Sequence, residues 1–336
     1  MTSPRPLAVG LVPMETRREA VLRVATRAEE LGYSMFTVAE GWGLDAGVLL
    51  AEVAGRTSRI RLGTGILNVW GRSPATIAML AAGLAEVSAG RFELGLGAGS
   101  PQLAEGLHDV PFRAPVDRLA DVTRQVRRLL DGDRLEPTVP GGSRPLRLAV
   151  RPPGRIPIDL AALGPRAVRL CGELADAWLP FLLPLSRLDD GIRLLKEGAA
   201  RGSQERLPQV RPALPVAVSD DESSALELAR WWLTFYLTSM GPLYAATLRA
   251  SGFAAEVDEF LATAPGEPLA AGPRRLLDEL VVWGRPDAAR RSLDRWYAAG
   301  AELPGIVLPP GRDLDELEHA LEVFSPARQL DPAPAP

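Results

Sequence analysis

The segment IRLGTGILNVWGRSPATIAMLAAGLAEVSAGRFELGL, residues 60–96, has the pattern of one complete strand–helix–strand unit. Its apolar runs at 60–67 and 92–96 have the length and composition of buried strands. Between them, Ser73 is suited to cap a helix and Pro74 to occupy the first turn of that helix. Apolar side chains then recur at helical spacing, at Ile77, Leu80, Ala81, Leu84 and Val87. Two strands joined by one helix are predicted to lie parallel.

The same alternation of short apolar runs and longer helical segments continues along the chain. Eight runs are predicted to be strands: 7–12, 35–39, 60–67, 92–96, 157–162, 177–182, 212–218 and 305–308. Eight strands alternating with helices favour a (β/α)8 TIM barrel over a doubly wound sheet. We expect one barrel domain over residues 1–325, with insertions after the fourth strand and between the seventh and eighth. A Pro/Ala-rich tail at 326–336 is expected to be disordered.

Composition and charge exclude several classes of protein. The 336 residues are 46% apolar and 24% charged, as in ordinary globular proteins. No apolar run approaches the roughly 18 residues that cross a bilayer, and the N-terminus lacks the features of a signal peptide. A net charge of −4 without a basic stripe argues against nucleic acid as a partner. One cysteine, Cys171, and two histidines argue against a metal site. We expect a cytoplasmic enzyme that binds neither membranes nor nucleic acid.

Residues 95–99, GLGAG, follow a predicted strand and contain part of the glycine pattern of dinucleotide-binding proteins. In that motif a helix begins immediately, so that its N-terminal amides meet the pyrophosphate. Here Pro101 follows at once, and the residues up to Pro115 have the composition of a loop. We therefore do not expect a Rossmann-type site.

A better anion site lies at Gly164, Pro165 and Arg166, directly after the fifth predicted strand. Glycine lets a ligand approach the backbone closely, and proline suits the first turn of a helix. The exposed amides and the dipole of a helix N-terminus favour a phosphate, to which Arg166 can add a charge-assisted contact. The alternative is an ordinary helix start with a solvated arginine, and the residues alone leave both interpretations open.

Four segments together resemble the bacterial luciferase-like family of flavin- and deazaflavin-dependent oxidoreductases. They are TGILNVWGRSPATIAMLAAGLAEVSAGRFELGLGAGSP at 64–101, GLHDVPFRAP at 106–115, IPIDLAALGPRAVRLCGELADAWLPFLLP at 156–184 and VVWGRPDAARRSLDRWYAAG at 281–300. The resemblance extends over nearly the whole chain, and it is specific in combination. It implies a TIM barrel that binds FMN or coenzyme F420 at the C-terminal ends of its strands.

The resemblance also implies which residues hold the coenzyme. A non-proline cis peptide late in the third strand, pressed against the coenzyme ring, corresponds to Gly65–Ile66. The coenzyme phosphate falls on Gly164, Pro165 and Arg166. The ring and ribityl side are lined by Asn68, Gly99 and Ser100. Cations for the polyglutamate tail of F420 are expected from Arg72, Arg151, Arg155 and Arg166.

Candidate catalytic residues are Glu40 and Trp42, which end the second strand, and His108 in the loop after the fourth strand. Glu40 can serve as a proton donor if burial raises its pKa, or it can be a carboxylate satisfied by hydrogen bonds at the barrel mouth. Several family members have a histidine where this chain has Glu40-Gly41-Trp42, and many have Asp-Gly-Trp where this chain has Asp176-Ala177-Trp178. The first departure argues against histidine chemistry at the second strand, and the second argues against a close approach of the coenzyme to the backbone at Ala177.

Three functions remain open. The first is an F420-dependent oxidoreductase that transfers a hydride between the deazaflavin and a polarised C=C or C=N bond of a small-molecule or modified-peptide substrate. The second is an FMN-dependent monooxygenase with a partner flavin reductase, and the third is a non-catalytic barrel that has lost its coenzyme. A homodimer is expected because four aromatic side chains crowd one helix, at Trp231, Trp232, Phe235 and Tyr236. The sequence does not identify the substrate.

Overall fold

The computed structural model describes residues 5–135, 142–202 and 206–329. In this part of the chain, parallel pairings join eleven strands into one sheet. These are β1 (Ala8–Leu11), β2 (Met35–Val38), β3 (Arg61–Thr64), β4 (Leu67–Asn68), β5 (Phe92–Gly97), β6 (Ile158–Ala161), β7 (Ala177–Trp178), β8 (Gln209–Val210), β9 (Ala213–Val218), β10 (Val282–Gly284) and β11 (Gly305–Leu308). Each of the eight predicted runs overlaps at least one of these strands, and the run at 60–67 overlaps both β3 and β4; the short strands β8 and β10 lie outside the predicted runs.

The pairings close the sheet into a barrel. From β1 they proceed through β2, β3, β5, β6 and β7 to β8, and on the other side of β1 they proceed through β11 to β9. Only Arg211 and Pro212 separate β8 from β9, so these two strands are one extended segment that meets both neighbours. Proline has no N–H to donate to a strand ladder, which accounts for the interruption. The predicted TIM barrel is confirmed.

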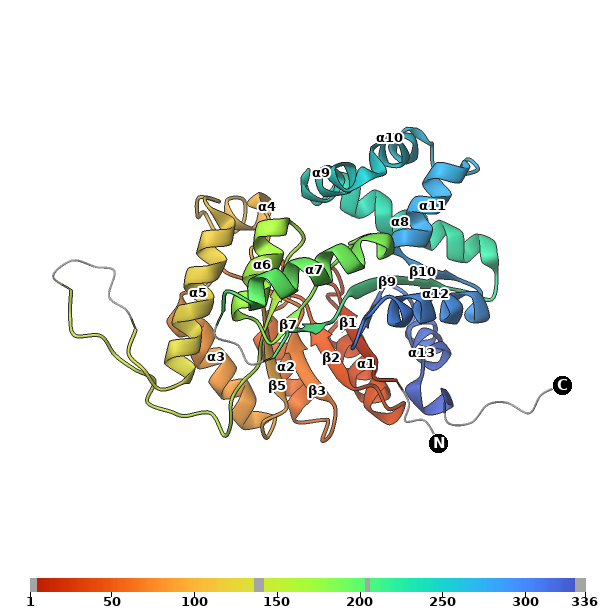
Figure 1. Ribbon diagram of the computed structural model, residues 1–336. Coiled ribbons are helices and arrows are strands. Elements are labelled where there is room, and N and C mark those ends of the chain that lie inside the picture. The colour runs from red at the N-terminus through yellow and green to blue at the C-terminus, as the bar shows by residue number, and fades with distance from the viewer. Residues whose placement is uncertain (1–4, 136–141, 203–205, 330–336) are drawn as a thin grey trace.

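Helices cover the outside of the barrel (Figure 1). They are α1 (Arg18–Glu30), α2 (Ala46–Ala54), α3 (Pro74–Val87), α5 (Pro115–Leu130), α6 (Pro165–Leu174), α7 (Leu188–Ala199), α12 (Pro286–Ala298) and α13 (Leu314–Val323). The Ser73 side chain accepts a hydrogen bond from Thr76 N and Pro74 begins α3, as predicted. No helix among the described residues has the length and apolarity needed to cross a membrane.

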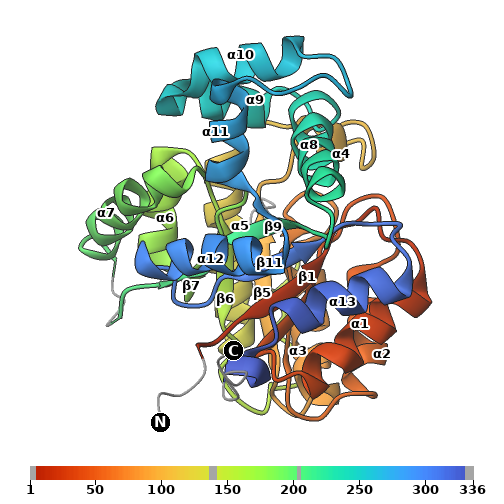
Figure 2. The same cartoon turned by 90° about the vertical axis from the view of Figure 1, so that its right-hand side faces the viewer.

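Two insertions enlarge the barrel where the sequence predicts them. After β5 come α4 (Pro101–Ala104) and, beyond α5, an irregular segment that extends away from the barrel (Figure 1). Between β9 and β11 come α8 (Glu222–Thr238), α9 (Leu243–Leu248), α10 (Ala254–Ala262) and α11 (Ala271–Leu280). These four helices gather at one end of the barrel (Figure 2) and have a hydrophobic core of their own around Trp232, Phe253 and Leu276.

Two sequence expectations need correction. Residues 100–115 are not all loop, because Ser100 accepts a hydrogen bond from Leu103 N and begins the short helix α4. Disorder does not begin at residue 326, because residues Pro326–Gln329 form a 3₁₀ turn in which Ala327 N donates to Leu31 O over 3.3 Å. The rest of the predicted tail, 330–336, lies outside the described residues.

A buried ionic cluster fills the barrel interior near the N-terminal ends of the strands. Arg211 Nη1 donates to Glu93 Oε2 over 2.5 Å and to Asp159 Oδ2 over 2.9 Å, and Arg61 Nη1 donates to Glu93 Oε1 over 2.6 Å. Burial raises the pKa of Asp159 to about 7, against the opposing attraction of Arg211. This cluster lies at the end of the barrel opposite the site described next.

Candidate active site at the C-terminal end of the barrel

The strand that carries much of the site is bent between β3 and β4. The Gly65–Ile66 peptide bond at the bend is cis, as predicted. Thr64 Oγ1 donates to Gly95 O over 2.8 Å and accepts from Gly95 N over 2.9 Å, which fixes the bend against β5. A Cβ on Gly95 would lie 2.0 Å from Thr64 O, and one on Gly97 would lie 2.9 Å from Ile66 Cδ1. The glycines of the GLGAG segment therefore permit close strand packing rather than dinucleotide binding.

Asn68, at the end of β4, is buried and organises the turn that follows it. Its Oδ1 accepts from Trp70 N over 3.0 Å and from Gly71 N over 2.9 Å. Because two backbone donors occupy Oδ1, the amide orientation is determined and Nδ2 faces His108 Nε2 at 3.3 Å. The structure thus brings together two of the predicted site residues from different loops.

The hydrogen bond from Asn68 decides which tautomer a neutral His108 ring adopts. Nε2 accepts from the Asn68 amide, so a neutral His108 carries its hydrogen on Nδ1. Nδ1 has no hydrogen-bond partner among the residues that the structure describes. The ring packs on the backbone at Gly71, where a Cβ would lie 2.6 Å from His108 Cε1. His108 is therefore held in place with one N–H available.

Glu40 and Arg72 form an ion pair that joins two loops at the barrel mouth. Arg72 Nη2 donates to Glu40 Oε2 over 2.6 Å and to Asp45 Oδ2 over 2.7 Å. Glu40 Oε2 also accepts from Ala46 N over 3.3 Å. The hydrogen bond to Glu40 raises the pKa of Arg72 further above its usual value. This arrangement favours the interpretation of Glu40 as a satisfied carboxylate. It also leaves Arg72 engaged by two acids, of which Asp45 is also the N-cap residue of α2.

Trp42 lies at the edge of a cleft of about 260 Å3, and its side chain is half exposed. The cleft is lined by Trp42, Ser100, Gln102, Leu103, Gly106, Leu107, Ser239 and Met240. Ser239 and Met240 follow α8. The sequence did not reveal their role in the site, because they lie more than 100 residues along the chain from the other lining residues. Apolar side chains dominate the wall, so the cleft suits an apolar ligand.

The N-terminus of α6 has the features expected of an anion site. Gly164 is the N-cap residue, and no side chain caps the helix. Asp45, Ser73, Ser100 and Asp221 cap α2, α3, α4 and α8 with their side chains, whereas α1, α5, α7 and α12 share with α6 the absence of a side-chain cap. A Cβ on Gly164 would meet no atom within 4 Å, so the space before these amides is open. Arg166 is exposed and paired with Asp117 of α5.

Two of the expected tail-binding cations lie at the wrong end of the barrel. Arg155 Nη1 donates to Asp176 Oδ1 over 2.6 Å, and Asp176 precedes β7. The Arg151 guanidinium lies beside Gly132, which follows the C-terminus of α5. Both positions are near the N-terminal ends of strands, because α5 and the segment before β7 return there from the mouth. Of the four arginines, Arg72 and Arg166 are at the mouth. The described residues contain no group of three or more metal-binding side chains.

Comparisons with known proteins identify the family. The profile of the luciferase-like monooxygenases matches residues 4–303. The chain belongs to this family. Over 320 residues it is 31% identical to a Mycobacterium tuberculosis protein named as a coenzyme F420-dependent oxidoreductase, with 88% of this chain and 91% of that protein aligned.

Other family relatives differ in chemistry. The chain is 30% identical to the 4-hydroxyprotoasukamycin monooxygenase of Streptomyces nodosus subsp. asukaensis, over 81% of this chain and 83% of the relative. Its fold is similar to that of an F420-dependent secondary alcohol dehydrogenase solved with an F420–acetone adduct, with a TM-score of 0.75 at 19% identity, covering 96% of this chain and 99% of the other. The resemblance noted in the sequence and the barrel are both confirmed.

Proposed function

We propose that this luciferase-like barrel is an oxidoreductase that uses coenzyme F420 and transfers a hydride to or from a polarised C=C or C=N bond of a small-molecule or modified-peptide substrate. The observation that carries the proposal is the 31% identity with an F420-dependent oxidoreductase over 88% of the chain. When bound, a deazaflavin supplies the hydride chemistry, and the protein supplies position, shielding and a proton.

The residues present fit the phosphate of such a coenzyme. The amides of Arg166 and Ala167 face open space at the start of α6, and the missing side chain at Gly164 leaves room for the phosphate. The bend at Gly65 and Ile66 is the surface against which a planar ring would rest. Gly99 and Ser100 border the same mouth between β5 and α4.

Among the predicted catalytic residues, His108 is the one that keeps a hydrogen-bond donor available to a substrate. Its Nδ1 hydrogen is free of described partners, while both Glu40 oxygens accept hydrogen bonds from Arg72. We assign Asn68 the positioning of His108, and the Glu40–Arg72 pair the positioning of the mouth loops. Trp42 and the apolar cleft beside it exclude water and bind the substrate.

A second candidate is an FMN-dependent monooxygenase that receives reduced flavin from a partner reductase. The 30% identity with 4-hydroxyprotoasukamycin monooxygenase favours it. The apolar cleft at Trp42 suits either reaction, so coenzyme choice separates them. The third hypothesis, a barrel without coenzyme, receives no support from the uncapped start of α6.

A homodimer is also proposed, on the aromatic face of α8. Trp232 and Tyr236 are buried in the insertion, but Trp231 is 38% exposed and stacks on Phe235 at 5.6 Å. An exposed pair of stacked rings is a suitable centre for an interface. Sedimentation of wild type and Trp231→Glu should show a dimer that the charge dissociates. A wild-type monomer at high concentration would refute it.

A paired titration tests the coenzyme assignment. Purified protein is titrated separately with F420 and with FMN, and binding is followed by fluorescence quenching and calorimetry. We expect F420 to bind at least tenfold more tightly than FMN. Preference for FMN would replace the proposal with the monooxygenase, and the absence of binding to either would support the non-catalytic barrel.

A further inference from the structure

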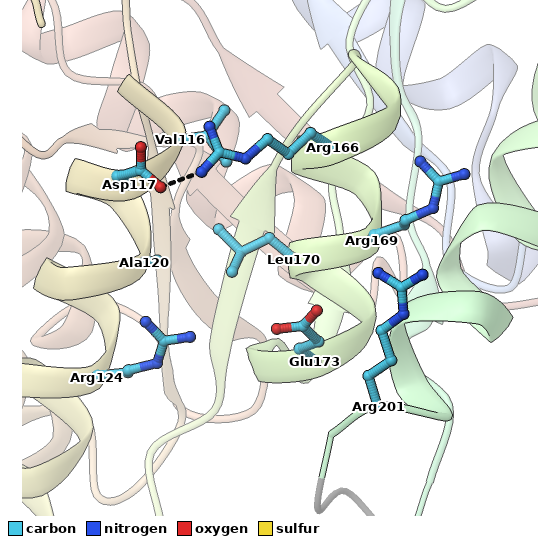
Figure 3. A pocket seen from close by; sticks show the side chains of 9 residues that line it. All are labelled: Val116, Asp117, Ala120, Arg124, Arg166, Arg169, Leu170, Glu173 and Arg201. Carbon is cyan, nitrogen blue, oxygen red and sulfur yellow. Dashed lines mark hydrogen bonds and ion pairs between the residues drawn. The ribbon is translucent and has the colours of Figure 1, made fainter. Parts of the chain in front are cut away.

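A second cavity, of about 430 Å3, lies outside the barrel between α5 and α6. Four arginines contribute to its wall: Arg124 from α5, Arg166 and Arg169 from α6, and Arg201 after α7. Asp117 and Glu173 are the acidic residues of the wall, and Glu197 beside it pairs with Arg169, which leaves one positive charge in excess. Figure 3 shows Arg166 reaching across to Asp117, and Arg201 extending toward α6 on the side of Arg169.

Ion pairing divides the four arginines into two groups. Arg166 is paired with Asp117, and Arg169 is paired with Glu197 over 2.8 Å. Arg124 and Arg201 have no side-chain partner within the described part of the chain. Cations that converge on one cavity from different elements repel one another, and a bound anion relieves that repulsion. The cavity is therefore complementary to a negatively charged ligand.

The distribution of the cations favours an extended ligand over a compact one. Arg166 and Arg169 lie one turn apart on α6, whereas Arg124 comes from α5 and Arg201 follows α7. Arg166 is also close to the uncapped N-terminus at Gly164. A single small anion would contact some of these cations, whereas a chain with several charges can contact more of them.

We propose that this cavity binds an extended, multiply charged oxyanion, whose carboxylate or phosphate groups are held by Arg124, Arg169 and Arg201. Two sources share this chemistry. One is the glutamyl tail of F420, continuing outward from a phosphate at Gly164, and this source rests on the proposed function. The other is a free oligophosphate or polycarboxylate metabolite, which does not depend on the coenzyme.

Calorimetric titration with inorganic tripolyphosphate tests the site directly. We expect Arg124→Ala combined with Arg201→Ala to weaken binding at least tenfold. The matched control is Arg291→Ala, an exposed arginine in the middle of α12, which should bind like wild type. Arg124→Lys with Arg201→Lys retains the charge and should restore most of the affinity. Two results together would overturn the proposal: wild type and the double alanine variant bind tripolyphosphate equally, and they also bind the tailed coenzyme equally.

Two forms of the coenzyme separate the sources. F420 with a glutamyl tail and its tail-less form are each titrated into wild type and the double alanine variant. If the tail is the ligand, it improves wild-type affinity severalfold and this gain disappears in the variant. If both forms bind wild type equally while tripolyphosphate still requires the arginines, the ligand is a free anion. Failure of both forms to bind wild type would refute the proposed function, and the tripolyphosphate result would still decide the cavity.

Discussion

Asn68 Nδ2 lies 3.3 Å from His108 Nε2, and this contact connects the end of β4 to the turn after α4. The Asn68 amide cannot rotate without losing two backbone hydrogen bonds to its oxygen. A fixed donor therefore faces one ring nitrogen of His108, and the other nitrogen is left to carry the hydrogen. Asn68 therefore fixes both the orientation of the His108 ring and the nitrogen that carries its hydrogen.

Nitrogen-15 NMR of labelled histidine tests this tautomer without a substrate. Above the pH at which the ring ionises, we expect His108 to be protonated on Nδ1 in wild type. In Asn68→Ala the fixed donor is gone, and the population should shift toward the Nε2–H form. His319, the only other histidine, serves as the reference within the same spectrum. An Nε2–H tautomer in wild type would contradict the assignment.

The glycines of β5 are predicted to be required by packing. In Gly95→Ala the new Cβ would meet Thr64 O at 2.0 Å, and backbone atoms cannot move aside cheaply. We expect a loss of about 2–3 kcal/mol in the free energy of unfolding. Gly83→Ala in α3 is the matched control, because a Cβ there meets nothing within 4 Å. It should stabilise by about 0.5–1 kcal/mol, since alanine favours helix. Urea denaturation measures both, and equal effects would refute the packing argument.

Substitutions at Gly164 should weaken coenzyme binding without lowering the stability of the protein. Asp and Asn are both good N-caps, so Gly164→Asp and Gly164→Asn should each hold or slightly raise the melting temperature. Gly164→Asp places a carboxylate where the phosphate is proposed to bind, and we expect it to weaken F420 binding at least a hundredfold. Gly164→Asn adds similar bulk without charge and should weaken binding less. Undiminished binding by the Asp variant would show that the phosphate lies elsewhere.

Stability should depend on pH through Asp159. Its folded-state pKa is raised to about 7, so between pH 4 and 7 the folded protein keeps a proton that the unfolded chain has lost. The free energy of unfolding therefore falls as pH rises through this range, by at most about 4 kcal/mol from this group. Asp159→Asn should flatten the fall between pH 4 and 7, whereas Asp189→Asn, at an exposed position, should not. Identical slopes in wild type and Asp159→Asn would contradict the assignment.

Local signals in the sequence predict most of the barrel. The apolar runs and the Ser73–Pro74 helix start depend on residues close together in the chain, whereas the Gly65–Ile66 cis bond was expected only from the family resemblance. The break between β8 and β9 also has a local cause, Pro212, but the closure through these strands depends on pairings between distant segments. The short helix α4 was missed because loop composition concealed the Ser100 cap.

The positions of the site residues on the strands could be predicted from the sequence, but the contacts between those residues could not. Residues at the C-terminal ends of strands, such as Glu40 and Asn68, could be chosen because that end is where TIM barrels carry their sites. Their partners could not be chosen in this way, because the Arg72–Glu40 pair spans 32 residues of the chain and the Asn68–His108 contact spans 40. Arg155 was placed wrongly because sequence order does not say at which end of the barrel an irregular loop returns.

The most direct test of the central claim is a crystal structure of the protein with coenzyme F420. We expect the coenzyme phosphate to accept hydrogen bonds from the amides of Arg166 and Ala167, and the deazaflavin ring to rest against the Gly65–Ile66 bend with Trp42 and His108 at its edge. A coenzyme bound elsewhere, or crystals that take up FMN at this position and exclude F420, would contradict the assignment of this barrel as an F420-dependent oxidoreductase.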